Sequence, residues 1–502
     1  SNSAFGRRAL YNTTTGAKNT AVGAESLDAN TTGANNVSVG YRSLYQNTTG
    51  AANGAFGYQT LFSNTTGADN VAVGTNALYN NLTASNNTAV GRDSLFASTT
   101  GGNNTSVGME SLSSNTTGTE HAALGFQALK SNTTGHSNVA IGNEALENNT
   151  TASNNTAVGT KSLRANTTAT RNTAVGSDAL KASTTGSNNT AVGKAAMEAN
   201  TTGADNVSVG KHCALSNTTG SSIVAIGSNT LEGNTTGSFN TGVGQGALNA
   251  NTTASNNTAI GGNALINNTG GENTAVGKDA LKANVGANAN TAIGFGAGDA
   301  VNTGGVNTFV GLYAGAYTDP TQAGARNIMM GAYAHANGAS VDDAHGFGYD
   351  ISCGTGHTTV GKGSDDSRLQ FGSTNWNVVS DERYKKDIVD STAGLSFVNA
   401  LQPKTFKYKN LGELPATFNA YKADSTEVFK NSNTNHGFIA QEVKAAIDAD
   451  SSIKDGFQLW NVREDGSQGL GDGALIPILV KAIQELSEKN DALEARITAL
   501  EA

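Results

Sequence analysis

The chain has 502 residues, with 31 lysines and arginines against 40 aspartates and glutamates, and a formal net charge of −9. A balance this acidic offers no basic stripe for phosphate contacts, so we expect no nucleic-acid partner. Glycine is abundant, at 62 residues, while aromatic residues make up only 6%, which excludes one large core of big side chains. Burial has to come from small residues stacked many times.

Cys213 and Cys353 lie far apart in different sequence contexts, so both are expected to be free thiols. No run of 18 apolar residues is present, and no membrane insertion is predicted. The first residues lack the basic and apolar regions of a signal peptide, and the chain begins inside a repeat. We expect neither a cofactor nor a metal site.

Residues 1–311 carry a repeat in which a glycine follows a motif of the form Asn-Thr-Ala-Val. The spacing then shortens once to reach Gly277 and lengthens to reach Gly331. A fixed period of this kind is typical of a solenoid. The glycines with a constant spacing of 17 residues are Gly6, Gly23, Gly40, Gly57, Gly74, Gly91, Gly108, Gly125, Gly142, Gly159, Gly176, Gly193, Gly210, Gly227, Gly244 and Gly261.

A typical unit runs from Asn19 to Gly33 and predicts two short strands and two corners. The β-branched Val22 and the larger Leu27, with their equivalents, are expected to form two buried apolar columns when the coils stack. Glycine supplies corner conformations with positive φ, and asparagine tolerates them and can form ladders with its copies. The fold class is therefore mainly β, a parallel β-roll or β-solenoid of 17-residue repeats.

One unit departs from the pattern, because in Gly210–Leu215 the leucine comes one residue late. A small bulge is expected there. His212 and Cys213 have no second His/Cys pair nearby, so a structural role is favoured over metal binding. Aspartate is too sporadic for a calcium-binding β-roll, and corner geometry explains the Asn-Thr-Thr triplets better than glycosylation does. Without paired carboxylates in the array, an enzyme acting on glycans is disfavoured.

The units resemble the Asn-Thr-Ala-Val-Gly repeats of trimeric surface fibres, whose heads are parallel β-rolls like those of trimeric autotransporter adhesins. The resemblance covers roughly residues 1–335. It implies a homotrimer with three chains packed side by side. The C-terminal membrane β-barrel of the autotransporters has no counterpart, because the end of this sequence is predicted to be helical and charged.

Residues 312–379 are expected to form degenerate repeats and a capping β-segment. Strand-like runs occur at 358–360, 368–371 and 376–379, separated by Gly, Ser and Asp. The last coil of a solenoid needs a cap, because it otherwise exposes an edge and an apolar face. His335, His345 and His357 are expected to be solvent-exposed structural residues.

Residues 380–502 have an ordinary composition, with 33 charged residues against 38 in all that precedes them. Four motifs resemble, in order, the intramolecular chaperone domain of phage endosialidases and tail spikes. They are Ser380–Ile388, Val398–Tyr408, His436–Val443 and Leu475–Leu486. The resemblance implies a trimeric, self-cleaving serine peptidase that helps the upstream fibre to assemble.

Carried onto this sequence, the resemblance implies a cut between Val379 and Ser380, with Ser380 as nucleophile and Lys385 as general base. Such a lysine must be neutral, through desolvation or neighbouring cations. Ser380 and Lys385 would lie about 140° apart on one continuous helix, so a bend between them is required. His436 is either an auxiliary residue or a buried structural histidine.

The last element, about 474–502, has apolar residues at alternating intervals of four and three from Leu479 to Leu500, with Asn490 in one core slot. This pattern predicts a coiled coil. By the parallel-dimer rule its core residues favour two strands, whereas the resemblance implies three; the trimer is preferred, because a short terminal helix does not set the symmetry of a whole domain.

The leading hypothesis is a phage tail-fibre or tail-spike shaft, in a virion tail or at an extracellular surface, with a host receptor or glycan as a further partner. The alternative is a bacterial or environmental surface filament or adhesin with the same assembly domain. Near-identical repeats make chain register almost degenerate under a slip of 17 residues. A terminal domain that associates first would clamp the register, and cleavage would then release it.

Overall fold

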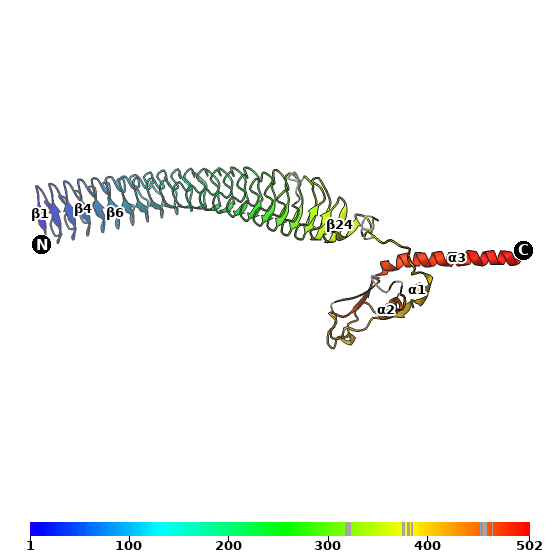
Figure 1. Ribbon diagram of the computed structural model, residues 1–502. Helices are drawn as coiled ribbons and strands as arrows, with labels where there is room; N and C mark the ends of the chain where they lie inside the picture. The colour runs from blue at the N-terminus through cyan, green and yellow to red at the C-terminus, as the bar shows by residue number, and fades with distance from the viewer. Residues whose placement is uncertain are drawn as a thin grey trace. The chain divides into compact units, whose positions relative to one another are not determined.

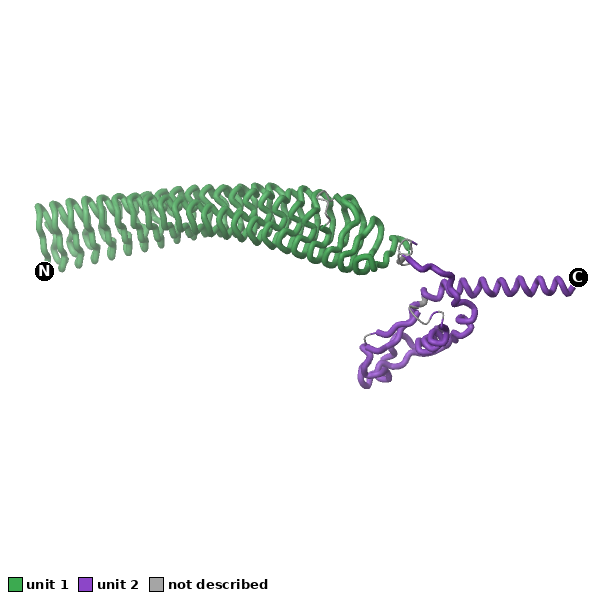
Figure 2. The backbone as a smooth tube through the Cα atoms, in the orientation of Figure 1, with its two compact units in different colours: residues 1–379 green, residues 380–502 purple. Residues whose placement is uncertain are grey.

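The computed structural model describes residues 1–501 except 317–322, 374–376, 379–381, 383–384, 452, 454–458 and 464. The chain divides into two compact units, residues 1–379 and residues 380–502 (Figure 2).

The first unit is a parallel β-solenoid with one three-residue strand in each repeating coil (Figure 1). Consecutive strands pair with residues 17 positions apart, as Ala157 does with Ala174, so the predicted period and fold class are confirmed. The strands are β1 (Ser3–Phe5), β2 (Thr20–Val22), β3 (Val37–Val39), β4 (Gly54–Phe56), β5 (Val71–Val73), β6 (Thr88–Val90), β7 (Thr105–Val107), β8 (Ala122–Leu124), β9 (Val139–Ile141), β10 (Thr156–Val158), β11 (Thr173–Val175), β12 (Thr190–Val192), β13 (Val207–Val209), β14 (Val224–Ile226), β15 (Thr241–Val243), β16 (Thr258–Ile260), β17 (Thr274–Val276), β18 (Thr291–Ile293), β19 (Thr308–Val310) and β20 (Ile328–Met330).

The single shortening of the repeat is absorbed at a corner and leaves the sheet in register. Thr258 pairs with Thr274, only 16 residues on. The Asn268 side chain reaches the carbonyl of Gly270, two residues ahead, whereas Asn251 reaches Ala254, three residues ahead. The missing residue therefore belongs to the corner, where it does not interrupt strand pairing.

The prediction of a buried valine column is wrong. Val22 is 38% exposed, whereas Ala21 in the middle of the same strand is fully buried. Successive side chains of a strand point to opposite faces, so only the central residue of a three-residue strand can face inward. The narrow interior is filled by that small residue and by the leucine column, in which Leu27 and Leu163 are fully buried.

The second strand predicted for each unit is also wrong, because the residues that follow the glycine form turns. Gly23 has a φ of 132°, and a Cβ there would lie 2.4 Å from the carbonyl oxygen of Gly40. Glu25 and Leu27 then take left-handed φ values of 60° and 50°. A non-glycine residue in that region costs roughly 1–2 kcal/mol. Complete burial of the leucine side chain offsets this cost.

Asparagine ladders, as predicted, join the coils. At the corner, the Asn47 amide donates to the side-chain oxygen of Asn30 at 2.9 Å, and Asn64 donates to Asn47 at 2.7 Å. A second ladder precedes the strands, where the Asn19 side-chain oxygen accepts the backbone N–H of Asn36 at 2.9 Å. These residues are buried, so each ladder satisfies polar groups that water cannot reach.

The expected bulge near Cys213 is wrong, because the register continues without interruption from Val207 opposite Val224. Ala214 takes the position of the leucine column, with a φ of 49° and complete burial. Leu215 then falls on the next column, at the surface. The Cys213 thiol is free and buried, and burial raises its pKa.

His121 replaces a ladder asparagine and makes the solenoid sensitive to acid. It is 2% exposed, its Nε2 lies 2.7 Å from the carbonyl oxygen of Gly135, and its Nδ1 accepts the N–H of Asn138 at 3.2 Å. Burial lowers the pKa of His121 from 6.5 to about 4. The nitrogen that would take a proton is already an acceptor, so the ring stays neutral.

We expect acid to destabilise the solenoid through this residue. Between pH 6.5 and about 4 the unfolded chain binds a proton that the folded chain refuses, so stability falls as the pH falls through this window. The full loss is about 3 kcal/mol per chain. Thermal unfolding followed by circular dichroism at pH 7.5 and 4.5 should show a smaller acid shift for His121→Asn than for the wild type. Equal shifts would contradict this assignment.

A capping segment closes the C-terminal end of the solenoid, as predicted. Strands β22 (His345–Tyr349) and β24 (His357–Lys362) continue the parallel sheet, and β25 (Asp365–Gln370) and β26 (Asn377–Val378) turn antiparallel. A short pair, β21 (His335–Ala336) and β23 (Ser352–Cys353), lies beside them in sequence. The three histidines are half-buried strand residues, so their predicted full exposure is wrong.

The second unit is a small α+β domain that ends in a long helix, as predicted. Its core is formed by buried apolar residues that include Phe397, Val443, Ile447 and Ile478. Its elements are α1 (Leu395–Ala400), β27 (Lys404–Phe406), η2 (Leu411–Glu413), β28 (Asn435–Gly437), α2 (Ala440–Ala449), β29 (Trp460–Val462), β30 (Gln468–Leu470), η3 (Asp472–Ala474) and α3 (Leu475–Glu501).

Candidate functional site

The predicted cleavage site lies at the junction of the two units. Val379 and Ser380 are outside the described residues, so the position of the predicted nucleophile rests on the sequence. Lys385, the predicted base, is described and exposed. Its backbone N–H donates to the carbonyl of Glu382 at 2.9 Å, which closes a tight turn. A turn at this place suits the bend that a Ser380–Lys385 pair requires.

His436 lies on β28, which pairs antiparallel with β27 and places His436 opposite Thr405. Its side chain is exposed, so the alternative of a buried structural histidine is wrong. An auxiliary role at the cleavage site stays a prediction.

A contact that the sequence did not reveal fastens the segment after the junction to the last helix. The Glu485 carboxylate on α3 accepts the backbone N–H of Leu395, the first residue of α1, at 2.8 Å. A carboxylate at this position satisfies a free N–H and complements the positive end of the helix. A Cβ at Gly394 would lie 2.5 Å from a carboxylate oxygen of Glu485, so glycine is needed there. Only the packing of α1 on α3 creates this contact, and no local motif signals it.

Helix α3 exposes a long apolar row, which is the predicted coiled-coil seam. The polar member of the row, Asn490, donates to Glu494 at 3.1 Å. Apolar side chains this exposed on a helix mark an association surface. The row comprises Leu479 (42% exposed), Ile483 (66%), Leu486 (56%), Leu493 (53%), Ile497 (53%) and Leu500 (85%).

The surface column next to the buried leucines differs from coil to coil. Tyr45, Phe62, Tyr79 and Phe96 stack along it with ring centroids 5.0 to 5.3 Å apart. Their interplanar angles of 4° to 16° mean that each ring face between Tyr45 and Phe96 is covered by the next ring. Stacked in this way, the rings stabilise neighbouring coils and offer few open faces to a sugar.

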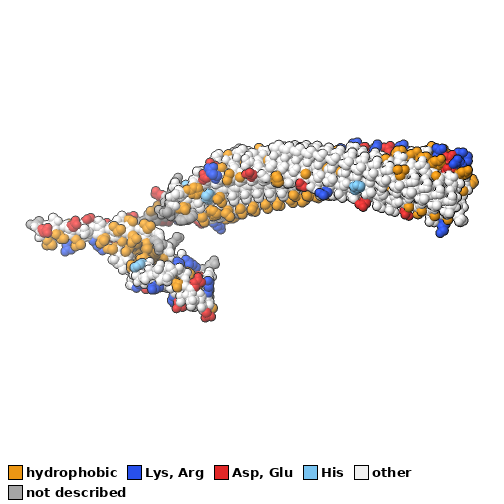
Figure 3. All heavy atoms as spheres, turned by 180° about the vertical axis from the view of Figure 1, so that it is seen from behind, with side chains coloured by type: hydrophobic (Ala, Val, Ile, Leu, Met, Phe, Trp, Pro, Cys, Tyr) orange, Lys and Arg blue, Asp and Glu red, His pale blue; other side chains and the backbone are white. Residues whose placement is uncertain are grey.

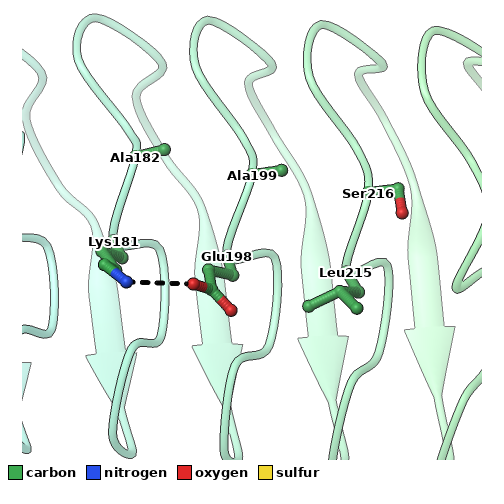
Figure 4. Close-up of a pocket in the computed structure, with 6 residues that line it drawn as sticks. All are labelled: Lys181, Ala182, Glu198, Ala199, Leu215 and Ser216. Carbon is green, nitrogen blue, oxygen red and sulfur yellow. Dashed lines mark hydrogen bonds and ion pairs between the residues drawn. The ribbon is translucent and has the colours of Figure 1, made fainter.

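Further along the same column lies a shallow depression of about 420 Å³, lined by residues of three successive coils (Figure 4). Leu215 supplies an apolar wall, and Lys181 forms an ion pair with Glu198 at 3.1 Å. Hydrogen bonds to Glu198 and Asp178 raise the pKa of Lys181, so this lysine stays charged. Such a closed ion pair does not supply the acid and base that glycoside hydrolysis needs.

Two further searches bear on function. No helix within the described ranges combines the length and the apolar character that a bilayer crossing needs. The side chains that the structure describes include no cluster of three or more His, Cys, Asp or Glu residues that could hold a metal ion.

Together, the two units define a class of protein: a β-solenoid fibre followed by a small chaperone-type domain. Residues 380–450 match the peptidase family model described as chaperone of endosialidase. The match begins at Ser380, and together with the solenoid it fits a tail-spike-type protein with an intramolecular chaperone domain. Neither the curated proteins nor the solved structures gave a match to the chain.

Proposed function

We propose that the protein is the shaft of a phage tail fibre or tail spike. Its C-terminal unit trimerises, sets the register of the chains and is then released by self-cleavage between Val379 and Ser380. The observation that carries the proposal is the family match over residues 380–450, which starts at the proposed nucleophile. The solenoid before it supports a structural role, because its described surface offers an ion pair and stacked rings rather than a catalytic centre.

The chemistry of the cut follows from the position of the nucleophile beside the bond it breaks. The Ser380 hydroxyl attacks the carbonyl carbon of Val379, and Lys385 takes the hydroxyl proton. The C–N bond breaks as the nitrogen is protonated, which leaves an ester between Val379 and the Ser380 side chain. Water then hydrolyses the ester and frees a Val379 carboxylate and a new N-terminus at Ser380.

Trimerisation supports the timing of this reaction. Lys385 is exposed in the single chain, and a lysine becomes neutral near pH 7 only in a desolvated setting. Burial of the junction between assembled chains would supply that setting. Cleavage would then follow assembly, so the clamp is not lost before the register is set.

The native mass and the fragment ends of the purified full-length chain test this proposal. We expect a shaft fragment whose native mass by light scattering is three times its mass on a denaturing gel. The smaller fragment should begin Ser380-Asp381-Glu382 on N-terminal sequencing. A monomeric shaft, or a different N-terminus, would contradict the proposal.

A further inference from the structure

The outer face of the solenoid sheet carries no charge over nineteen strands. In β2 to β19 the central residue of each strand is buried, and the first and third residues point outward. None of these outward residues, nor those of β1, is charged. Val73 is 37% exposed, Val175 36% and Ile260 42%, and Figure 3 shows hydrophobic side chains in a row along one edge of the solenoid. Soluble proteins normally interrupt such a face with charges.

The two outward columns compensate for one another in size. In sixteen of the strands from β1 to β19 the first residue is Thr or Val and the third is Val or Ile. The other three strands have a larger third residue, and each has a smaller first one: Ser3 with Phe5, Gly54 with Phe56, and Ala122 with Leu124. Water accommodates side chains of any size, whereas a packed surface requires a constant volume. This pairing therefore indicates a face that is covered.

The repeat identifies what covers it. A partner has to present the same spacing over the same length, and a second copy of the chain is the surface on the page that does so. Nineteen strands at about 4.8 Å each, about 10 Å wide, give about 900 Å² of face per chain. This area matches the roughly 800 Å² that each partner contributes to a stable interface.

We infer that this uncharged face is the surface through which copies of the chain pack together, in parallel and with equivalent coils at equal height. The inference rests on the proposed trimer and adds the part of the shaft that forms it. The coils of Phe5, Phe56 and Leu124 then serve as register marks, since a slip of one repeat would set a large residue against a valine coil that has no small neighbour.

Disulfide cross-linking of the full-length chain tests the face. In Val158→Cys, on the third column of β10, we expect oxidation to link chains into covalent dimers through Cys at position 158, seen on a non-reducing gel and identified by peptide mass. Thr168→Cys is the matched control, because Thr168 is an exposed corner residue of the same coil. The native Cys213 and Cys353 are buried and serve as the unmodified background.

The outcomes separate this inference from the proposed function. A trimeric mass with no more cross-linking in Val158→Cys than in Thr168→Cys would overturn the face and leave the trimer standing. A monomeric mass would overturn both. Size compensation gives a second measurement: Gly54→Thr should lower the melting temperature of the assembled fibre, and adding Phe56→Val should restore it. Failure of the pair to restore it would also overturn the face, because a Cβ at Gly54 meets Phe56 only at an ordinary 3.4 Å within one chain.

Discussion

Ser380→Ala should leave the chain at its full length of 502 residues on a denaturing gel, where the wild type gives two fragments. Without the hydroxyl there is no nucleophile beside the Val379 carbonyl, so the loss should be essentially complete. Lys385→Met should have the same effect, because no base takes the hydroxyl proton. Lys386→Met is the matched control, since it removes a neighbouring exposed cation, and it should still be cut.

The ester intermediate gives this prediction a sharper form. Hydroxylamine attacks esters, so adding it to freshly assembled wild-type protein should speed cleavage and leave a hydroxamate on Val379, detectable by mass spectrometry. It should do nothing to Ser380→Ala. Two fragments from Ser380→Ala, cut at the same bond, would show that another group is the nucleophile.

A chain consisting of residues 1–379 alone should fail to form uniform fibres. Pairing residues 17 apart sets alanine against alanine in coil after coil, as with Ala157 and Ala174, so most one-repeat slips between chains cost little. Parallel, non-local pairing is slow and exposes strand edges while it proceeds. We expect aggregates and fibres of uneven length by electron microscopy. The same residues matured from the full-length chain should give fibres of one length.

Full-length Ser380→Ala separates assembly from cleavage. It keeps the clamp attached, so it should form fibres as uniform as those of the wild type while remaining uncut. Uniform trimers from residues 1–379 alone would show that the solenoid sets its own register. The marks at Phe5, Phe56 and Leu124 would then be sufficient without the C-terminal unit.

Sequence reasoning located the repeat because its signal is periodic and local. The glycines need a positive φ, and the asparagines need copies of themselves above and below, so both leave a mark at every seventeenth position. The C-terminal helix could be predicted for the same reason, from apolar intervals between Leu479 and Leu500. The cleavage residues came from resemblance, and Val379 and Ser380 keep the standing of a prediction.

The errors share one physical cause. A β-branched residue such as Val22 is equally suited to either face of a strand, and only the closed coil decides that Ala21 points inward. Leu27 adopts a left-handed conformation that no propensity favours, because its side chain fills the interior. Glu485 meets Leu395 across ninety residues only when α1 packs on α3.

By itself, the sequence determined the period, the parallel solenoid and the place where the fibre gives way to the chaperone domain, because each depends on residues close together in the chain. Which side of each strand faces outward was decided only by the tertiary structure, because facing is a property of the closed coil. That decision turned an expected core column of valines into an exposed, uncharged face.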